Sequence, residues 1–220
     1  MNSQHPISYM LKRHYSQKYL KYGNCSKGVD WGENVENSIS RHYAMLDVIT
    51  DSRNGCSLLD VGCGYGALLE TINHDKKFSK VKYAGIDIVS EMIDSAKSKY
   101  KNAKWTHADY INTSTTTRFD YIVSNGILTQ KASASNLEMN QYAQLLITKM
   151  FMQCKIGIAF NIMSTFVNFQ KDNLYYRNPS ELIAWCMSTL TPHLKVNAHY
   201  DPWYEYTLYL YKGVNSLREH

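Results

Sequence analysis

LLDVGCGYG, residues 58–66, carries the strongest local signal in this chain. An apolar run at 57–62 leads into Gly62, Gly64 and Gly66, and a helical pattern follows at 66–73. Glycine lets the backbone turn sharply and lets a ligand approach, because it has no Cβ. A helix that starts there also offers free backbone N–H groups. The loop alone is a weak signal, because a tight turn without a ligand also uses glycines.

A second predicted strand, VKYAGIDI at 81–88, places Asp87 25 residues after Gly62. A carboxylate at that point can accept hydrogen bonds from both hydroxyls of a ribose. The dinucleotide fingerprint needs G-x-G-x-x-G, whereas the third glycine comes one residue earlier here. Asp60, just before the loop, would repel a pyrophosphate and attract a sulfonium or an amino group. The pattern therefore favours a cationic, adenosine-containing ligand over NAD.

The rest of the chain alternates strands with helices. We expect strands at 103–108, 119–125, 155–162, 194–200 and 204–212, and helices at 34–51, 90–100, 136–152 and 178–190. Asn34 and Asn178 are candidate caps, and Glu181 can complete a capping box. Such alternation predicts a mostly parallel sheet covered on both faces. The last two strands have hairpin spacing, so the final one should be antiparallel.

The predicted fold class is therefore α/β, Rossmann-like and doubly wound, with an antiparallel C-terminal strand and an N-terminal helical extension. The chain has 220 residues, and domains commonly have ~100–200 residues. We expect a lid or helical extension over 1–52 and one domain over 53–214.

Composition argues against several classes of protein. The five cysteines form no C-x-x-C pair and are odd in number, which disfavours a disulfide framework or a zinc site and favours the reducing cytoplasm. No run of ~18 apolar residues is present to span a membrane, and the N-terminus does not resemble a signal peptide. The net charge is +5 with scattered basic residues, which disfavours nucleic acid as a partner. The oligomeric state stays open.

Four motifs together resemble those of class I S-adenosylmethionine-dependent methyltransferases. LLDVGCGYG resembles their first motif, YAGIDI the second, THADY the third and FDYIVSNGIL the fourth, over residues 57–128. The resemblance implies S-adenosylmethionine as cofactor and S-adenosylhomocysteine as product.

The resemblance also implies a role for each matching position. Main-chain groups of Gly62, Cys63 and Gly64 would hold the methionine part, and Asp60 would help to bind its amino group. Asp87 would bind the ribose, and Ile88 would pack on the adenine. Asp109 would accept from the adenine amino group with Tyr110 beside it, and Ser124 and Asn125 would lie near the sulfonium. Alternatively, Asp60 caps the turn, Asp87 caps the next helix and Asp109 is an ordinary loop acid.

The flanking segments resemble, more loosely, a bacterial subgroup of small-molecule methyltransferases. This implies that Trp31 and Arg41 reach the cofactor, with the Arg41 fork on the methionine carboxylate. Core packing for Trp31 and a surface ion pair for Arg41 are the alternatives. Asn161, Tyr175 and Tyr176 are candidate acceptor-binding residues, because they belong to a long aromatic loop at 161–178, where the family's acceptor pocket usually forms. We expect this loop and the N-terminal segment to roof the site together.

The expected reaction is methyl transfer to oxygen or nitrogen of a small-molecule acceptor. No motif fixes a catalytic residue. His42, His199, Tyr175, Tyr176 and Glu205 are candidate bases, although such residues are often structural. No metal-binding pattern is evident. The Asn-Pro-Pro-Tyr signature of amino-methylating nucleic-acid enzymes is missing after the fourth strand. A macromolecular methyltransferase, acting on RNA or protein, and a non-catalytic S-adenosylmethionine-binding protein remain as alternatives.

Overall fold

A single mixed sheet forms the centre of the protein, in a computed structural model that describes residues 5–32, 35–199 and 204–213. The strands are β1 (Cys56–Val61), β2 (Val81–Asp87), β3 (Lys104–His107), β4 (Phe119–Ser124), β5 (Cys154–Ser164), β6 (Tyr176–Arg177), β7 (Leu194–Asn197) and β8 (Glu205–Tyr211). Their order is β3-β2-β1-β4-β5-β8-β7, and β6 pairs with the end of β5. β8 pairs in antiparallel fashion with both β5 and β7, and the other pairs are parallel.

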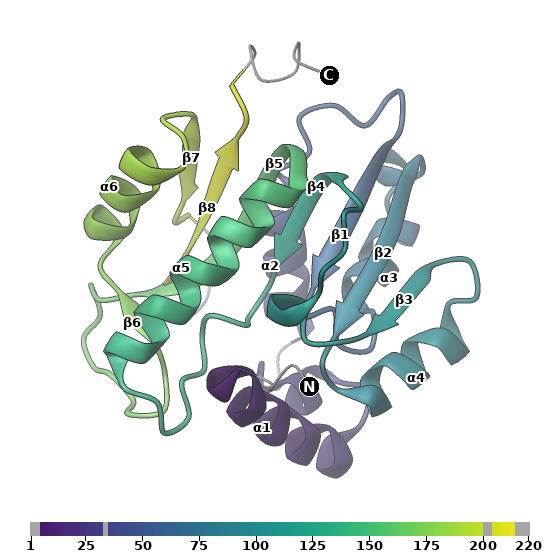
Figure 1. Ribbon diagram of the computed structural model, residues 1–220. Coiled ribbons are helices and arrows are strands. Elements are labelled where there is room, and N and C mark those ends of the chain that lie inside the picture. The colour runs from purple at the N-terminus through teal and green to yellow at the C-terminus, as the bar shows by residue number, and fades with distance from the viewer. Residues whose placement is uncertain (1–4, 33–34, 200–203, 214–220) are drawn as a thin grey trace.

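Helices cover both faces of the sheet (Figure 1). They are α1 (Pro6–Tyr22), α2 (Val35–Leu46), α3 (Ala67–His74), α4 (Ser90–Lys99), α5 (Asn136–Gln153) and α6 (Pro179–Thr189), with the short 3-10 helices η1 (Ser26–Val29), η2 (Lys76–Phe78) and η3 (Tyr110–Asn112). One apolar cluster joins the sheet to α5 and α6, and a second joins it to α2 and α3. Because both faces are covered, the central strands are almost wholly buried.

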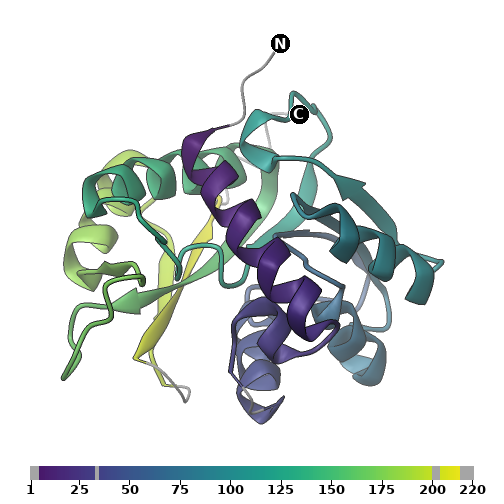
Figure 2. The ribbon, with the colours of Figure 1, turned by 90° about the horizontal axis from the view of Figure 1, so that it is seen from below.

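Helix α1 crosses the edge of the sheet at which the parallel strands end (Figures 1 and 2). Pro6 occupies its first turn, and the side chain of His5 accepts from the Ile7 N–H at 3.2 Å. The helix ends at Gly23, whose φ is 68°. Only Ile7, Ser8 and Leu11 are buried, so the apolar pattern is too weak to mark this helix in the sequence. The N-terminal extension is helical as predicted.

The predicted strands and helices are confirmed, with small shifts at their ends. Helix α2 ends at Leu46 rather than at residue 51, and its candidate cap Asn34 lies outside the described residues. Asn178 does cap α6, accepting from the Ser180 N–H at 2.9 Å. Glu181 instead faces Arg177, at 3.3 Å. The short strand β6 was not expected.

None of the described helices is long and apolar enough to cross a membrane. All five cysteines are free thiols, and Cys25 alone of them is exposed. Within the described part of the chain, no group of three or more histidine, cysteine or acidic side chains is placed to hold a metal ion.

Candidate functional site

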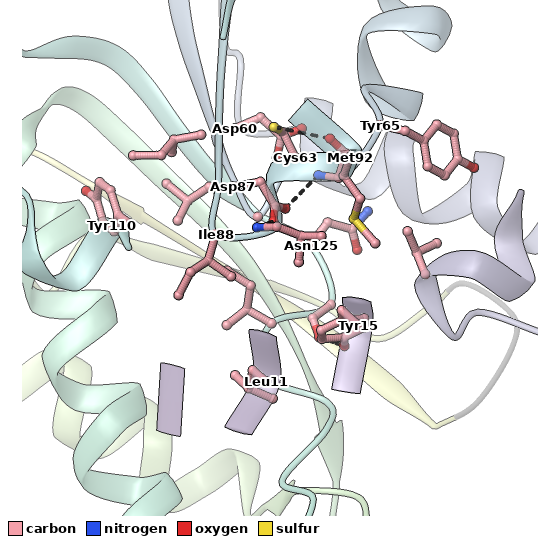
Figure 3. A pocket seen from close by; sticks show the side chains of 18 of the residues that line it. Leu11, Tyr15, Asp60, Cys63, Tyr65, Asp87, Ile88, Met92, Tyr110 and Asn125 are labelled. Carbon is pink, nitrogen blue, oxygen red and sulfur yellow. Dashed lines mark hydrogen bonds between the residues drawn. The ribbon is translucent and has the colours of Figure 1, made fainter. Parts of the chain in front are cut away.

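A cavity lies where β1, β2 and β4 end, beneath α1 (Figure 3). The empty space of this cavity, including the solvent at its open mouth, is about 970 Å³. Ten of the residues expected at a site line it: Trp31, Asp60, Gly62, Cys63, Gly64, Asp87, Ile88, Asp109, Tyr110 and Asn125.

The glycine loop forms one wall of this cavity. Gly62, Gly64 and Gly66 all have positive φ, at 77°, 53° and 88°. A Cβ on Gly62 would lie 2.6 Å from the side chain of Ile127. Glycine is therefore required at Gly62 both by the backbone and by the space around it.

Asp87 ties the glycine loop to the end of β2. One carboxylate oxygen accepts from the Gly64 N–H and the other from the Val89 N–H, both at 2.8 Å. Burial raises the pKa of Asp87, against the lowering effect of these N–H groups. Val89 is the N-cap residue of α4, and no side-chain cap is formed there, so Asp87 holds the backbone just before the helix. A carboxylate has about four lone-pair sites, which leaves acceptor capacity toward the cavity.

Asp60 is a buried carboxylate with half of its hydrogen-bonding capacity unused. Its Oδ2 accepts from the Tyr83 hydroxyl at 2.7 Å, while Oδ1 has no partner among the residues described. Burial raises the pKa of Asp60 to about 7, although the hydrogen bond from Tyr83 lowers it. Burying an unpaired carboxylate is costly, and a cationic ligand would relieve that cost.

The end of β4 adds three more unpartnered atoms. The Oγ of Ser124 and both side-chain polar atoms of Asn125 are buried, and the described chain offers them no hydrogen bond. Asn125 lines the cavity, whereas Ser124 is not among its lining residues. Buried polar groups are normally hydrogen-bonded, so the carboxyl ends of β1 and β4 are suited to a polar, positively charged ligand.

Asp109 and Tyr110 form the opposite end of the cavity. Asp109 accepts from the Ser8 hydroxyl of α1 at 3.0 Å and from the Asn112 amide at 2.9 Å. It also caps η3 through the Ile111 N–H. The Tyr110 hydroxyl donates to Gln153 at 2.7 Å, away from the cavity. Asp109 thus joins α1 to the loop after β3.

Arg41 does not line the cavity; it lies in a buried network beside it. Its Nε and Nη2 donate to Glu205 at 2.9 and 2.7 Å. Glu205 also accepts from Asn161, whose Oδ1 accepts from the Gly126 N–H at 2.7 Å. The third nitrogen of the fork, Nη1, is buried and has no partner in the described part of the chain. The ion pair of Arg41 is therefore buried, rather than on the surface as the alternative had it.

Trp31 connects this network to the cavity. Its ring lies 5.3 Å from the Arg41 guanidinium and 5.8 Å from the His42 ring. A Cβ on Gly126 would be 2.8 Å from the indole nitrogen, so Trp31 packs directly on that glycine.

Tyr175 and Tyr176 are placed away from the cavity. Tyr175 is buried and donates to Asn140 at 2.6 Å, and the Tyr176 hydroxyl accepts from the Lys171 N–H at 3.1 Å. Asn161 is also not a lining residue. His199, one of the candidate bases, is exposed.

Sequence reasoning missed several aromatic and polar lining residues. Tyr15, Tyr65 and Tyr142 line the cavity, as does Ser8, and His42 lines it as well although it was considered only as a base. Tyr15 and Ser8 belong to α1, the helix without a clear sequence signal.

The raised pKa of Asp60 predicts a dependence of stability on pH. The folded carboxyl titrates near 7, whereas an unfolded one titrates at about 3.9. Between about pH 4 and pH 7 the folded state binds more protons, so stability falls as the pH rises. We expect Asp60→Asn to reduce the fall in melting temperature between pH 5 and pH 8, measured by thermal unfolding.

Asp120→Asn is the control, because the pKa of Asp120 is lowered by its hydrogen bonds from Ser57. Asp120→Asn should not reduce the fall in melting temperature between pH 5 and pH 8. An equal fall in melting temperature for the wild type and Asp60→Asn would show that the pKa of Asp60 is not raised.

The comparisons with known proteins agree with this geometry. A family model described as a methyltransferase domain matches residues 52–207. The Mycobacterium tuberculosis protein Rv1506c, which is named as a methyltransferase, is 28% identical over 168 residues, covering 75% of this chain and 98% of that protein.

Solved structures share the fold at low sequence identity. Magnesium protoporphyrin IX methyltransferase of Synechocystis PCC 6803, with bound S-adenosylmethionine, superposes with a TM-score of 0.64 at 12% identity, covering 97% of this chain and all of that one. The plantazolicin methyltransferase BpumL gives a TM-score of 0.61 at 16% identity, covering 93% and 98%. The predicted fold class is therefore confirmed, and this chain belongs to the methyltransferase-domain family as a class I S-adenosylmethionine-dependent methyltransferase.

Proposed function

We propose that the protein transfers the methyl group of S-adenosylmethionine to oxygen or nitrogen of a small-molecule acceptor. The observation that carries this proposal is the set of unpartnered buried atoms beside the glycine loop, on Asp60, Ser124 and Asn125. They favour a ligand with a positive charge and hydrogen-bonding groups. Among the described residues that line the cavity there is no lysine or arginine, while Asp60, Asp87 and Asp109 bring carboxyl groups. A sulfonium with an amino group suits these surroundings.

Each part of the cofactor has residues suited to hold it. Asp87 would accept from the ribose hydroxyls, with Ile88, Asp109 and Tyr110 around the adenine. The main chain of Gly62, Cys63 and Gly64 would hold the methionine part, and Asp60 its amino group. Ser124 and Asn125 would lie near the sulfonium, with Trp31 close by.

When bound, the cofactor supplies a methyl group for direct displacement by a lone pair of the acceptor. The chain's part is to align the acceptor and to exclude water, and orientation alone can lower the barrier by several kcal/mol. Leu11 and Tyr15 of α1, together with Trp31, place apolar surface over the cavity. No side chain is assigned as the base.

Three observations favour a small acceptor. Helix α1 covers the cavity, which leaves limited room for a macromolecule to reach the cofactor. The basic residues are scattered along the chain. The structurally similar proteins named above take their names from magnesium protoporphyrin IX and plantazolicin. A macromolecular methyltransferase and a non-catalytic binding protein are the competing functions. We expect the enzyme to act in the cytoplasm, consistent with five free thiols.

Calorimetry with S-adenosylmethionine, S-adenosylhomocysteine and NAD tests the cofactor. We expect micromolar affinity for the first two, whereas tight binding of NAD alone would contradict the proposal. Release of S-adenosylhomocysteine in the presence of a panel of phenols and amines tests the acceptor class. Nanomolar affinity for RNA at physiological salt would instead favour the macromolecular function.

A further inference from the structure

His42 enters the cavity from α2 and keeps one ring nitrogen available. The residue is only 4% exposed, and it is one of the lining residues. Its Nδ1 lies 2.7 Å from the Thr71 hydroxyl on α3. Its Nε2 has no hydrogen-bond partner among the residues that the structure describes. A buried imidazole held at one nitrogen can offer the other to a ligand.

The contact with Thr71 locates His42 at the glycine-loop end of the cavity. Helix α3 begins at Ala67, directly after Gly66, and Ala67 also lines the cavity. Tyr65 and Tyr110 lie on opposite sides of Asp87 (Figure 3). His42 therefore belongs with Tyr65, at the end opposite to that where the adenine is proposed to bind.

The charges of the cavity indicate which groups of the cofactor the glycine-loop end must bind. The amino-acid part of S-adenosylmethionine carries an ammonium and a carboxylate. Asp60, with its unpartnered Oδ1, is suited to the ammonium. The carboxylate needs donors, and the lining residues among those described include no lysine or arginine. The start of α3 provides backbone N–H groups and the positive end of a helix dipole.

Arg41, the residue expected from the sequence to bind this carboxylate, already uses two nitrogens of its fork on Glu205. His42 follows it in the same helix and points to the cavity instead. We propose that His42 donates a hydrogen bond from Nε2 to the carboxylate of the cofactor's methionine part. This inference depends on the proposed function, because it assumes that S-adenosylmethionine occupies the cavity.

The surroundings of His42 also determine which ring nitrogen carries the proton. A neutral ring that donates from Nε2 must accept at Nδ1, so the Thr71 hydroxyl would be the donor in that contact. Burial and the nearby Arg41 charge lower the pKa of His42 to about 4, while Glu70 on α3 acts in the opposite direction. The ring is therefore neutral at pH 7, and Thr71 fixes the tautomer.

A two-by-two comparison of variants and ligands tests the proposal. The ligands are S-adenosylhomocysteine and its decarboxylated analogue, which keeps the amino group. We expect His42→Phe to weaken binding of S-adenosylhomocysteine by about tenfold or more, the effect of losing a hydrogen bond to a charged group. Affinity for the decarboxylated analogue should stay within about twofold. His42→Gln, which keeps a donor near the position of Nε2, should recover part of the loss.

His74→Phe is the matched control, because His74 is an exposed histidine on α3; it should change neither affinity. Equal weakening of both ligands by His42→Phe, or no weakening, would overturn the inference and leave the proposed function standing. A wild-type protein that binds neither ligand would refute the proposed function itself. If the Phe variant does not fold, Thr71→Val decides the matter, since it should selectively weaken the ligand with the carboxylate.

Discussion

Asp87→Ala is expected to weaken binding of S-adenosylmethionine and S-adenosylhomocysteine by about a hundredfold or more. The substitution would remove the proposed ribose acceptor, and it removes the hydrogen bond that Asp87 accepts from the Gly64 N–H at 2.8 Å. Hydrogen bonds to a charged group contribute about 1.5–3 kcal/mol each, and every 1.4 kcal/mol corresponds to about a factor of ten in affinity. Isothermal titration calorimetry on the folded variant measures the effect.

Asp120→Ala is the matched control for this experiment. Asp120 accepts from the Ser57 N–H and hydroxyl, both at 2.7 Å, so its carboxylate also anchors backbone. Asp120 lies near the start of β4 and Ser57 near the start of β1, away from the cavity. The control should lower the melting temperature without changing the affinity. An unchanged dissociation constant for Asp87→Ala would remove this residue from the ribose site.

Local patterns made most of the fold predictable. The glycine loop follows a buried strand and precedes a helix, and the carboxylate of Asp87 ends the next strand. These relations depend on neighbouring residues and on the parallel pairing of β1 with β2. The cap at Asn178 is equally local. Nine of the ten expected residues that line the cavity belong to motifs at the ends of strands, where the family resemblance implied their roles, whereas Trp31 lies before β1.

Contacts between distant parts of the chain were the part that could not be predicted. Arg41 pairs with Glu205, 164 residues later, and no local pattern indicates that pairing. Arg41 and His42 are adjacent, yet they point in different directions because successive helical residues differ by about 100° around the axis. Tyr175 and Tyr176 were chosen for their position after β5, but they pack against Asn140 and the Lys171 backbone instead.

The contacts of helix α1 could not be predicted from local patterns either. The prediction with the largest effect on turnover concerns this helix. Helix α1 contributes Ser8, Leu11 and Tyr15 to the cavity. The Ser8 hydroxyl donates to Asp109 at 3.0 Å, and the Tyr15 hydroxyl donates to the Gly126 carbonyl at 3.3 Å. The helix thus bridges the adenine end of the proposed site and the loop after β4.

Deleting residues 1–24 is therefore expected to abolish methyl transfer to the acceptor found in the panel, while the domain stays folded. The sheet and the cluster formed with α2 and α3 do not depend on α1, although loss of Ile7 and Leu11 from the other cluster should lower the melting temperature. Water would then reach the cavity, and the acceptor would lose one wall. Release of S-adenosylhomocysteine measures turnover, and circular dichroism checks the fold.

Hydrogen exchange separates a moving lid from a fixed cover. Lids of this kind commonly move on microsecond to millisecond timescales. If α1 opens to admit the cofactor, amides of residues 7–22 should gain protection when S-adenosylhomocysteine binds, because the closed state becomes more populated. Residues 165–175, which do not line the cavity, are the internal comparison and should change less. Protection of α1 that is the same with and without ligand, together with full turnover by the truncated protein, would show that α1 only covers the edge of the sheet.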